Sequence, residues 1–117
     1  MIILNKITDT IQLKLSGAIT TNQIDIVVSY DDMFPHGKDE SRQVSVSNDT
    51  TYVSICDAPG PSITRNIDYV CVYNKDTVNV EVEICYDDNG TKYCMLKQIL
   101  ASGETLQYNA SSGWAIF

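Results

Sequence analysis

The segment YDDNGTKYC, residues 86–94, gathers the residue types in this chain that are best suited to chemistry: carboxylates, an amide and a thiol. A calcium loop of the EF-hand type needs oxygen ligands at alternate positions before its glycine and a glutamate at its closing position. The residues around Gly90 do not follow that pattern. Asn89-Gly90 between two alternating runs instead favours a tight β-turn, because both residues tolerate positive φ. The segment therefore predicts a hairpin and not a metal loop.

Two registers of this hairpin are compatible with the sequence. A two-residue turn places Cys85 directly opposite Cys94 in a non-hydrogen-bonded pair, close enough for a cross-strand disulfide. A three-residue turn with a glycine bulge shifts the register by one residue, so that Cys85 faces Tyr93 and Glu81 faces Lys97. The candidate disulfide Cys85–Cys94 follows only from the first register, and a reducing compartment would disfavour it.

The four cysteines do not have the spacing of a zinc site. Such sites normally use short C-x-x-C pairs, and the chain contains none. Cys56 and Cys71 fall inside apolar strand patterns, which is typical of small hydrophobic core residues.

No constellation of residues indicates catalysis. His36 is the only histidine and lies in a polar stretch, and no G-x-S-x-G nucleophile motif is present. The paired carboxylates, such as Asp31-Asp32, are adjacent in sequence, so on a strand they would point to opposite faces. The glycine-containing segments lack the lysine of a phosphate loop. The sequence thus predicts a protein that is not an enzyme, with no catalytic, metal-binding or cofactor-binding residue.

Alternation of apolar and polar residues dominates the rest of the chain. It is clearest in residues 78–84, where valines and an isoleucine alternate with Asn79, Glu81 and Glu83. Turn signals separate about eight or nine such runs, and no window has helical spacing. We therefore expect an all-β fold, an antiparallel β-sandwich or jelly-roll, formed by a single domain over residues 1–117. DDMFPHGKDES, residues 31–41, is expected to be an irregular exposed loop.

The formal net charge is −7, with only eight lysines and arginines, which argues against nucleic-acid binding. No apolar stretch approaches the length of a membrane span or a signal-peptide core. We expect a protein that binds neither nucleic acid nor membrane and that is made in a cytoplasm. An acidic surface would suit a basic protein partner.

Several segments in a fixed order resemble a known class of proteins. They are TTNQIDIVVSY, DAPGPSITRNIDYVCVYNKDT, the hairpin around DDNGT, ILASGETLQY and the closing GW. Together they resemble small β-sandwich virion proteins of tailed bacteriophages, over about residues 10–114. The Ala58-Pro59 step, the Thr64-Arg65 pair and the turn at residues 74–77 carry most of the resemblance.

The resemblance implies a non-enzymatic structural component of the virion, made in the host bacterial cytoplasm. Its partners would be other virion proteins, such as the major capsid or tail protein, and copies of itself in a homo-oligomer. A capsid decoration (auxiliary head) protein is the first reading. The alternative is a tail or fibre-associated binding module that recognises a host-surface receptor or glycan, with exposed aromatic side chains as a sugar-stacking platform.

Four apolar residues are candidates for an interface with such partners. Met33 and Phe34 lie in the 31–41 segment, which is longer than a turn requires, and Pro35 limits its freedom. Alternatively, Phe34 folds back to cap the end of the sandwich. Trp114 and Phe117 near the C-terminus form a second candidate surface, or else belong to the core.

Overall fold

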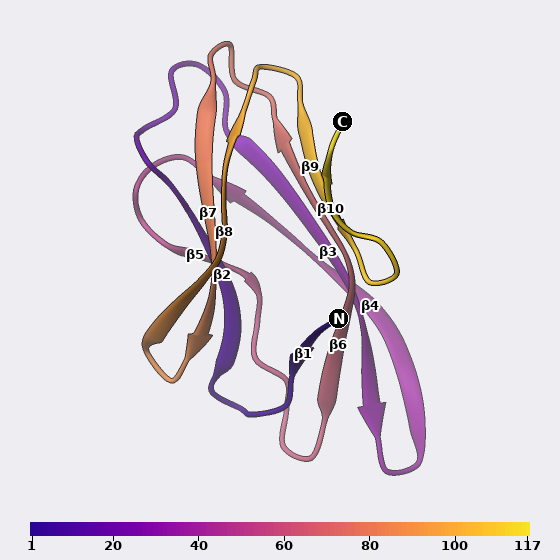
Figure 1. The fold of residues 1–117 in the computed structure, drawn as a ribbon. Coiled ribbons are helices and arrows are strands. Elements are labelled where there is room, and N and C mark those ends of the chain that lie inside the picture. The colour runs from indigo at the N-terminus through magenta and orange to yellow at the C-terminus, as the bar shows by residue number, and fades with distance from the viewer.

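Ten strands and no helix make up the computed structural model, which describes all residues from Met1 to Phe117 (Figure 1). The strands are β1 (Ile2–Leu4), β2 (Asp9–Leu15), β3 (Ile24–Phe34), β4 (Gly37–Ser47), β5 (Val53–Cys56), β6 (Thr64–Asn74), β7 (Val80–Asp88), β8 (Thr91–Leu100), β9 (Thr105–Asn109) and β10 (Gly113–Ile116). The expected all-β fold is confirmed. The count exceeds eight or nine partly because β1 has only three residues and no alternation to reveal it. The chain contains no helix with the length and apolar character needed to cross a membrane.

The strands form two antiparallel sheets. The six-stranded sheet has the order β10-β9-β6-β3-β4, and β1 pairs with the part of β6 that β9 leaves free. The four-stranded sheet has the order β5-β2-β7-β8. β4 is thus an edge of the first sheet and β8 an edge of the second.

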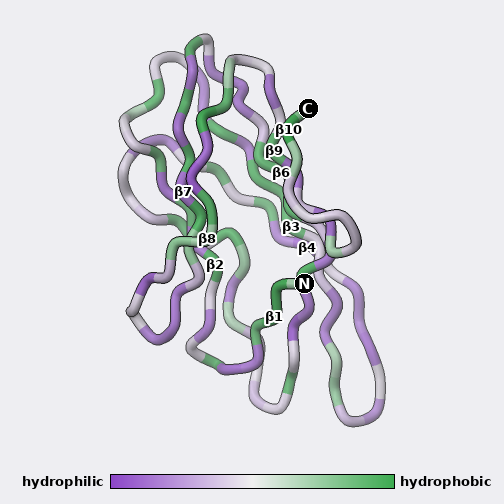
Figure 2. Tube along the Cα trace, viewed as in Figure 1, coloured by the Kyte–Doolittle hydropathy of each residue, from purple (hydrophilic) through white to green (hydrophobic).

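The core lies between the inner faces of the two sheets. Alternate residues of β2, such as Leu13 and Leu15, meet alternate residues of β3, such as Ile24 and Ile26, and all four are fully buried. Each such side chain contributes about 1.5–3 kcal/mol to folding relative to exposure. Figure 2 shows the hydrophobic residues along the strands and more hydrophilic stretches on the long arms of β3 and β4. The period-two pattern in the sequence is therefore the burial pattern of the sandwich.

Asp76 fastens the loops at one end of the sandwich. Its buried carboxylate accepts backbone N–H bonds from Thr20 at 2.7 Å, Thr21 at 2.8 Å, Asn22 at 3.1 Å and Thr77 at 2.9 Å. These bonds favour the ionised form and lower the pKa of Asp76 to about 2, against the opposing effect of burial. The turn at residues 74–77, on which the resemblance to phage proteins partly rests, thus has a structural role.

Residues 31–41 are not the irregular loop that the sequence suggested. β3 and β4 continue as a regular hairpin to the pair Phe34–Gly37, and only Pro35 and His36 form the turn. β6 also pairs with β3 as far as Met33–Thr64. The polar composition that indicated a loop is compatible with strands whose faces meet water, because the ladders satisfy the backbone hydrogen bonds.

Candidate functional site

The tip of the β3–β4 hairpin carries two of the predicted interface residues. Met33 is 41% exposed and Phe34 is 37% exposed, and neither packs against the hydrophobic core. The Phe34 ring lies beside Gly37, where an added Cβ would be 3.9 Å from ring atoms Cδ2 and Cε2. Phe34 therefore does not cap the end of the sandwich. The hairpin presents both side chains to solvent.

An ion pair holds the hairpin next to its tip. Arg65 on β6 donates from Nε to Asp32 Oδ1 at 2.8 Å and from Nη2 to Asp32 Oδ2 at 2.9 Å. The guanidinium carbon also lies 4.0 Å from the ring centre of Tyr30. The hydrogen bonds to Asp32 raise the pKa of Arg65, and both charged side chains are largely covered. A bidentate, stacked arginine fixes the direction of the hairpin because both its plane and its hydrogen bonds are set.

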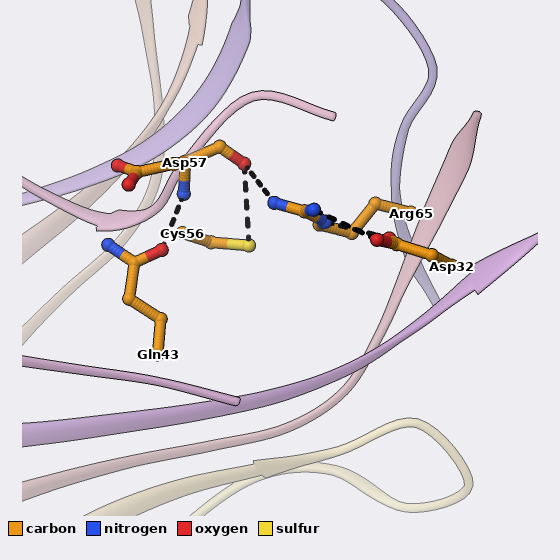
Figure 3. Close-up of polar contacts among 5 residues, drawn as sticks. All are labelled: Asp32, Gln43, Cys56, Asp57 and Arg65. Atoms are coloured by element: carbon orange, nitrogen blue, oxygen red, sulfur yellow. Dashed lines mark hydrogen bonds and ion pairs between the residues drawn. The ribbon is translucent and has the colours of Figure 1, made fainter. Parts of the chain in front are cut away.

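The same arginine connects the two sheets (Figure 3). Arg65 Nη1 donates to the carbonyl oxygen of Asp57 at 2.8 Å, and Asp57 directly follows β5 of the opposite sheet. The Cys56 thiol lies 3.9 Å from the same carbonyl, and burial raises its pKa to about 11, so it stays neutral. Arg65, from the Thr64-Arg65 pair noted in the sequence, and Asp57, which precedes the Ala58-Pro59 step, thus form a cross-sheet clamp.

Gln43, on the edge strand β4 of the six-stranded sheet, also binds Asp57. Its Oε1 accepts the Asp57 N–H at 2.8 Å, and its Nε2 donates to the carbonyl oxygen of Ser54 at 3.2 Å. One side-chain amide therefore joins β4 of the six-stranded sheet to β5 and Asp57 of the four-stranded sheet. Figure 3 shows Gln43 and Arg65 reaching Asp57 from opposite sides.

An acidic groove lies on the outer face of the six-stranded sheet, beside the β3–β4 hairpin. It has a volume of about 630 Å³, and the residues lining it are Ser29, Tyr30, Asp31, Glu40, Ser41, Arg42 and Asp68. Burial, and then the neighbouring Asp31 carboxylate, raise the pKa of Asp68. Lys38 lies 3.8 Å from Asp31 and 3.5 Å from Glu40, which offsets part of this negative charge. A positively charged side chain would relieve the remaining repulsion between the carboxylates.

The two residues of the second predicted interface, Trp114 and Phe117, lie in different environments. Trp114 packs against the core, with its ring centre 5.0 Å from that of Tyr108, whereas Phe117 is 69% exposed. Phe117 exchanges two backbone hydrogen bonds with Thr105, which pairs with Tyr73 at the far end of β6 from the hairpin. The structure therefore does not bring Phe117 together with Met33 and Phe34.

The β7–β8 hairpin adopts the first of the two predicted registers. Asp88 faces Thr91 across the Asn89-Gly90 turn, and Cys85 is paired with Cys94. Both turn residues have positive φ, 50° for Asn89 and 95° for Gly90. The two thiols are free in the structure, so the candidate disulfide stays a prediction.

Comparison of the chain with family models, with curated proteins and with solved structures finds no match. Any assignment of function therefore rests on the residues and their geometry and on the resemblance described above.

Sequence patterns did not reveal the acidic groove or the role of Arg65. Asp68 reaches the groove because a bulge in β6 leaves it unpaired between the pairs Ser29–Tyr69 and Tyr30–Ile67. A single sequence gives no signal for such a bulge. Arg65 and Asp32 lie on neighbouring strands, and only the register of β3 against β6 places them opposite each other.

Proposed function

We propose that this protein is a non-enzymatic structural component of a tailed-phage virion, an auxiliary head protein that docks onto the capsid by protein–protein contacts. The observation that carries the proposal is the β3–β4 hairpin, which presents Met33 and Phe34 outside the core and is held by an ion pair at the neighbouring Asp32. A hairpin whose shape is fixed before binding loses less conformational entropy on docking than a flexible loop would. The fixed shape therefore favours a role in binding a partner.

The charge distribution supports the same function. The acidic groove beside the hairpin suits an arginine or lysine of a partner, and the chain as a whole carries a charge of −7. Apolar anchors next to a charged rim are the usual composition of protein interfaces. The partner is then a capsid protein with a basic, partly apolar surface, and each copy of this protein makes the same contact around the symmetric shell.

The alternative, a receptor- or glycan-binding module of a tail or fibre, has less support from the geometry. It requires aromatic rings gathered on a solvent-facing surface. Tyr73 and Tyr93 are the tyrosines with large exposure, at 39% and 58%, and they belong to different sheets. Trp114 and Tyr108 pack together at the core. We therefore retain the head protein as the proposal.

The decisive experiment uses particles of the phage that carries this gene. Purified virions are analysed by mass spectrometry, and particles made without the gene are mixed with purified protein. We expect the protein in the virion, and saturable binding to the head at a fixed number of copies per capsid. Absence from the virion together with no binding to the particles would make the proposal wrong. A cryo-EM map with this fold at a fibre tip would instead favour the alternative.

A further inference from the structure

Three side chains of the kinds that bind metals meet on the four-stranded sheet, remote from the proposed docking hairpin. They are Glu83 and Cys85 on β7 and Cys94 on β8. One carboxylate oxygen and the two Sγ atoms all lie within 4.8 Å of one another. Glu83 and Cys85 share a face because they are two residues apart on one strand. Cys94 joins them because it is the cross-strand partner of Cys85.

A β-bulge makes this arrangement compatible with the core. The register changes from the pair Cys85–Cys94 to the pair Ile84–Leu96, which leaves Met95 as the extra residue. Cys94 and Leu96 would share a face in a regular strand. With the bulge, Leu96 packs against the core while Cys94 remains exposed on the outer face beside Cys85. Bulges often aim side chains in this way next to functional sites.

The cluster is covered on the side of Cys85 and open to solvent on the side of Cys94. Tyr52, which precedes β5, lies over it, with its hydroxyl oxygen 3.2 Å from Glu83 Oε2 and 3.5 Å from Cys85 Sγ. Cys85 is only 1% exposed, whereas Cys94 is exposed. A second groove, of about 240 Å³, reaches Glu83 from the direction of Lys14 and Lys97. An ion could therefore enter from solvent and meet a sulfur ligand that water does not reach.

We propose that Glu83, Cys85 and Cys94 bind a Zn²⁺ ion, with water or the Tyr52 hydroxyl at the fourth position. Thiolate sulfur and carboxylate oxygen are both zinc ligands, and the thiolates disfavour magnesium and calcium. Tetrahedral zinc with bonds of about 2.3 Å to sulfur and 2.0–2.2 Å to oxygen separates its ligand atoms by roughly 3.5–3.8 Å. The three ligand atoms therefore need to close by at most about 1 Å. The two thiol protons pass to solvent when the ion binds.

The charges around the site balance when the ion is present. Two thiolates and one carboxylate carry three negative charges, and the ion carries two positive charges. Lys14 supplies the remaining positive charge, because its Nζ lies 3.4 Å from Glu83 Oε2. Lys14 and Lys92 also flank the Tyr52 ring, at 5.0 Å and 5.1 Å from its centre. Because the ligands, the ion and Lys14 together carry no net charge, the free-energy cost of holding the buried Cys85 sulfur as a thiolate is lower.

The experiment uses the full-length protein kept reduced, so that a Cys85–Cys94 disulfide cannot compete for the same sulfurs. Zn²⁺ is titrated against a chromophoric chelator, and Co²⁺ serves as a spectroscopic probe of the ligands. We expect one ion per chain and thiolate-to-cobalt charge-transfer bands. Cys94→Ser should weaken binding by more than about 100-fold, since losing even an outer-shell partner costs about 10–100-fold. Glu83→Gln should weaken binding by at least about tenfold.

Two matched variants serve as controls. Glu81→Gln removes the next carboxylate along the same face of β7, which pairs with Lys97 at 3.8 Å, and Cys71→Ser removes a thiol of the other sheet. Both should bind zinc like the wild type. Cys94 is exposed, so a thermal melt should show that Cys94→Ser folds normally. The proposal is wrong if the reduced wild type binds no zinc, if Cys94→Ser binds normally, or if Glu81→Gln is as weak as Glu83→Gln. Unchanged affinity in Glu83→Gln would overturn the three-ligand assignment.

Discussion

Asp32 and Arg65 meet in a two-pronged ion pair, with Nε to Oδ1 at 2.8 Å and Nη2 to Oδ2 at 2.9 Å. Both side chains are largely covered, at 15% and 11% exposure. Arg65 also donates to the Asp57 carbonyl of the opposite sheet, so one guanidinium joins the end of β3, β6 and the segment after β5. We therefore regard this pair as the element that sets the direction of the proposed docking hairpin.

Replacing Arg65 should destabilise the fold. Arg65→Ala leaves the Asp32 carboxylate covered and unpaired, and we expect a loss of about 3 kcal/mol in the free energy of unfolding. Arg65→Lys should lie between this variant and the wild type, because lysine keeps the charge but not the planar fork. Arg42→Ala, at an exposed arginine, should change stability by less than about 0.5 kcal/mol. Urea unfolding would measure all three, and equal losses for Arg65→Ala and Arg42→Ala would contradict the clamp.

Asp76 should make part of the stability depend on pH. Its pKa is about 2 in the folded protein, below the ordinary value of 3.8, because the ionised carboxylate accepts backbone N–H bonds. The ionised form therefore stabilises the fold above about pH 4, and this contribution is lost as the pH falls through about 2. Asp76→Asn should be less stable than the wild type at pH 7, and the difference should narrow between pH 4 and pH 2.

Melting temperatures measured across that pH range would test the Asp76 prediction. Asp49→Asn is the matched control, because the Asp49 carboxylate accepts one N–H bond, from Thr51, in an exposed turn. Its melting temperature should follow that of the wild type at every pH. A constant difference between Asp76→Asn and the wild type from pH 7 to pH 2 would show that the Asp76 charge is not responsible.

The hairpin tip should matter for assembly and not for folding. In the double variant Met33→Ser and Phe34→Ser, binding to particles should weaken, while the melting temperature of the isolated protein stays within about 2 °C of the wild type. The reason is that neither side chain packs against the core. Ile7→Ser with Ile99→Ser, at exposed apolar residues outside the six-stranded sheet, is the control for the loss of exposed apolar surface. A large thermal loss in the tip variant would place Phe34 in the folded core.

The Asn89-Gly90 turn offers a test of backbone conformation alone. Gly90 has a φ of +95° and no neighbouring atom within 4 Å of an added Cβ, so alanine there meets strain without a clash. We expect Gly90→Ala to cost about 1–2 kcal/mol. Gly17→Ala also meets no atom within 4 Å but at ordinary φ, and it should be neutral or slightly stabilising. Equal effects of the two substitutions would argue against a strained turn at Gly90.

The fold could be predicted from the sequence wherever burial alternates. Val80, Val82 and Ile84 are buried as their spacing implies, and Asn89-Gly90 forms the turn that its residue types favour. The arm of β3 and β4 was predicted wrongly. Its polar residues make no one-sided pattern, because both strands meet water there and only pairing keeps them extended.

The zinc ligands could be predicted only in part. The sequence left two hairpin registers open, and the structure adopts the one that places Cys85 opposite Cys94. Glu83 lies two residues from Cys85, but its relevance depends on the bulge at Met95 and on Tyr52. Tyr52 precedes β5 and reaches the site because β5 pairs with β2. Neither this strand pairing nor the bulge in β8 leaves a local pattern in the sequence.

The central position of β6 has a consequence for how the chain folds. β6 pairs with β1, β3 and β9, so its neighbours come from residues 2–4, 24–33 and 105–109. Only the hairpins β3–β4, β7–β8 and β9–β10 join strands that are consecutive in the chain. Such distant pairing predicts folding in milliseconds to seconds and not microseconds. During synthesis β6 cannot complete its ladder until Asn109 has left the ribosome, so the β9 side of β6 stays without hydrogen-bond partners until the chain is nearly finished.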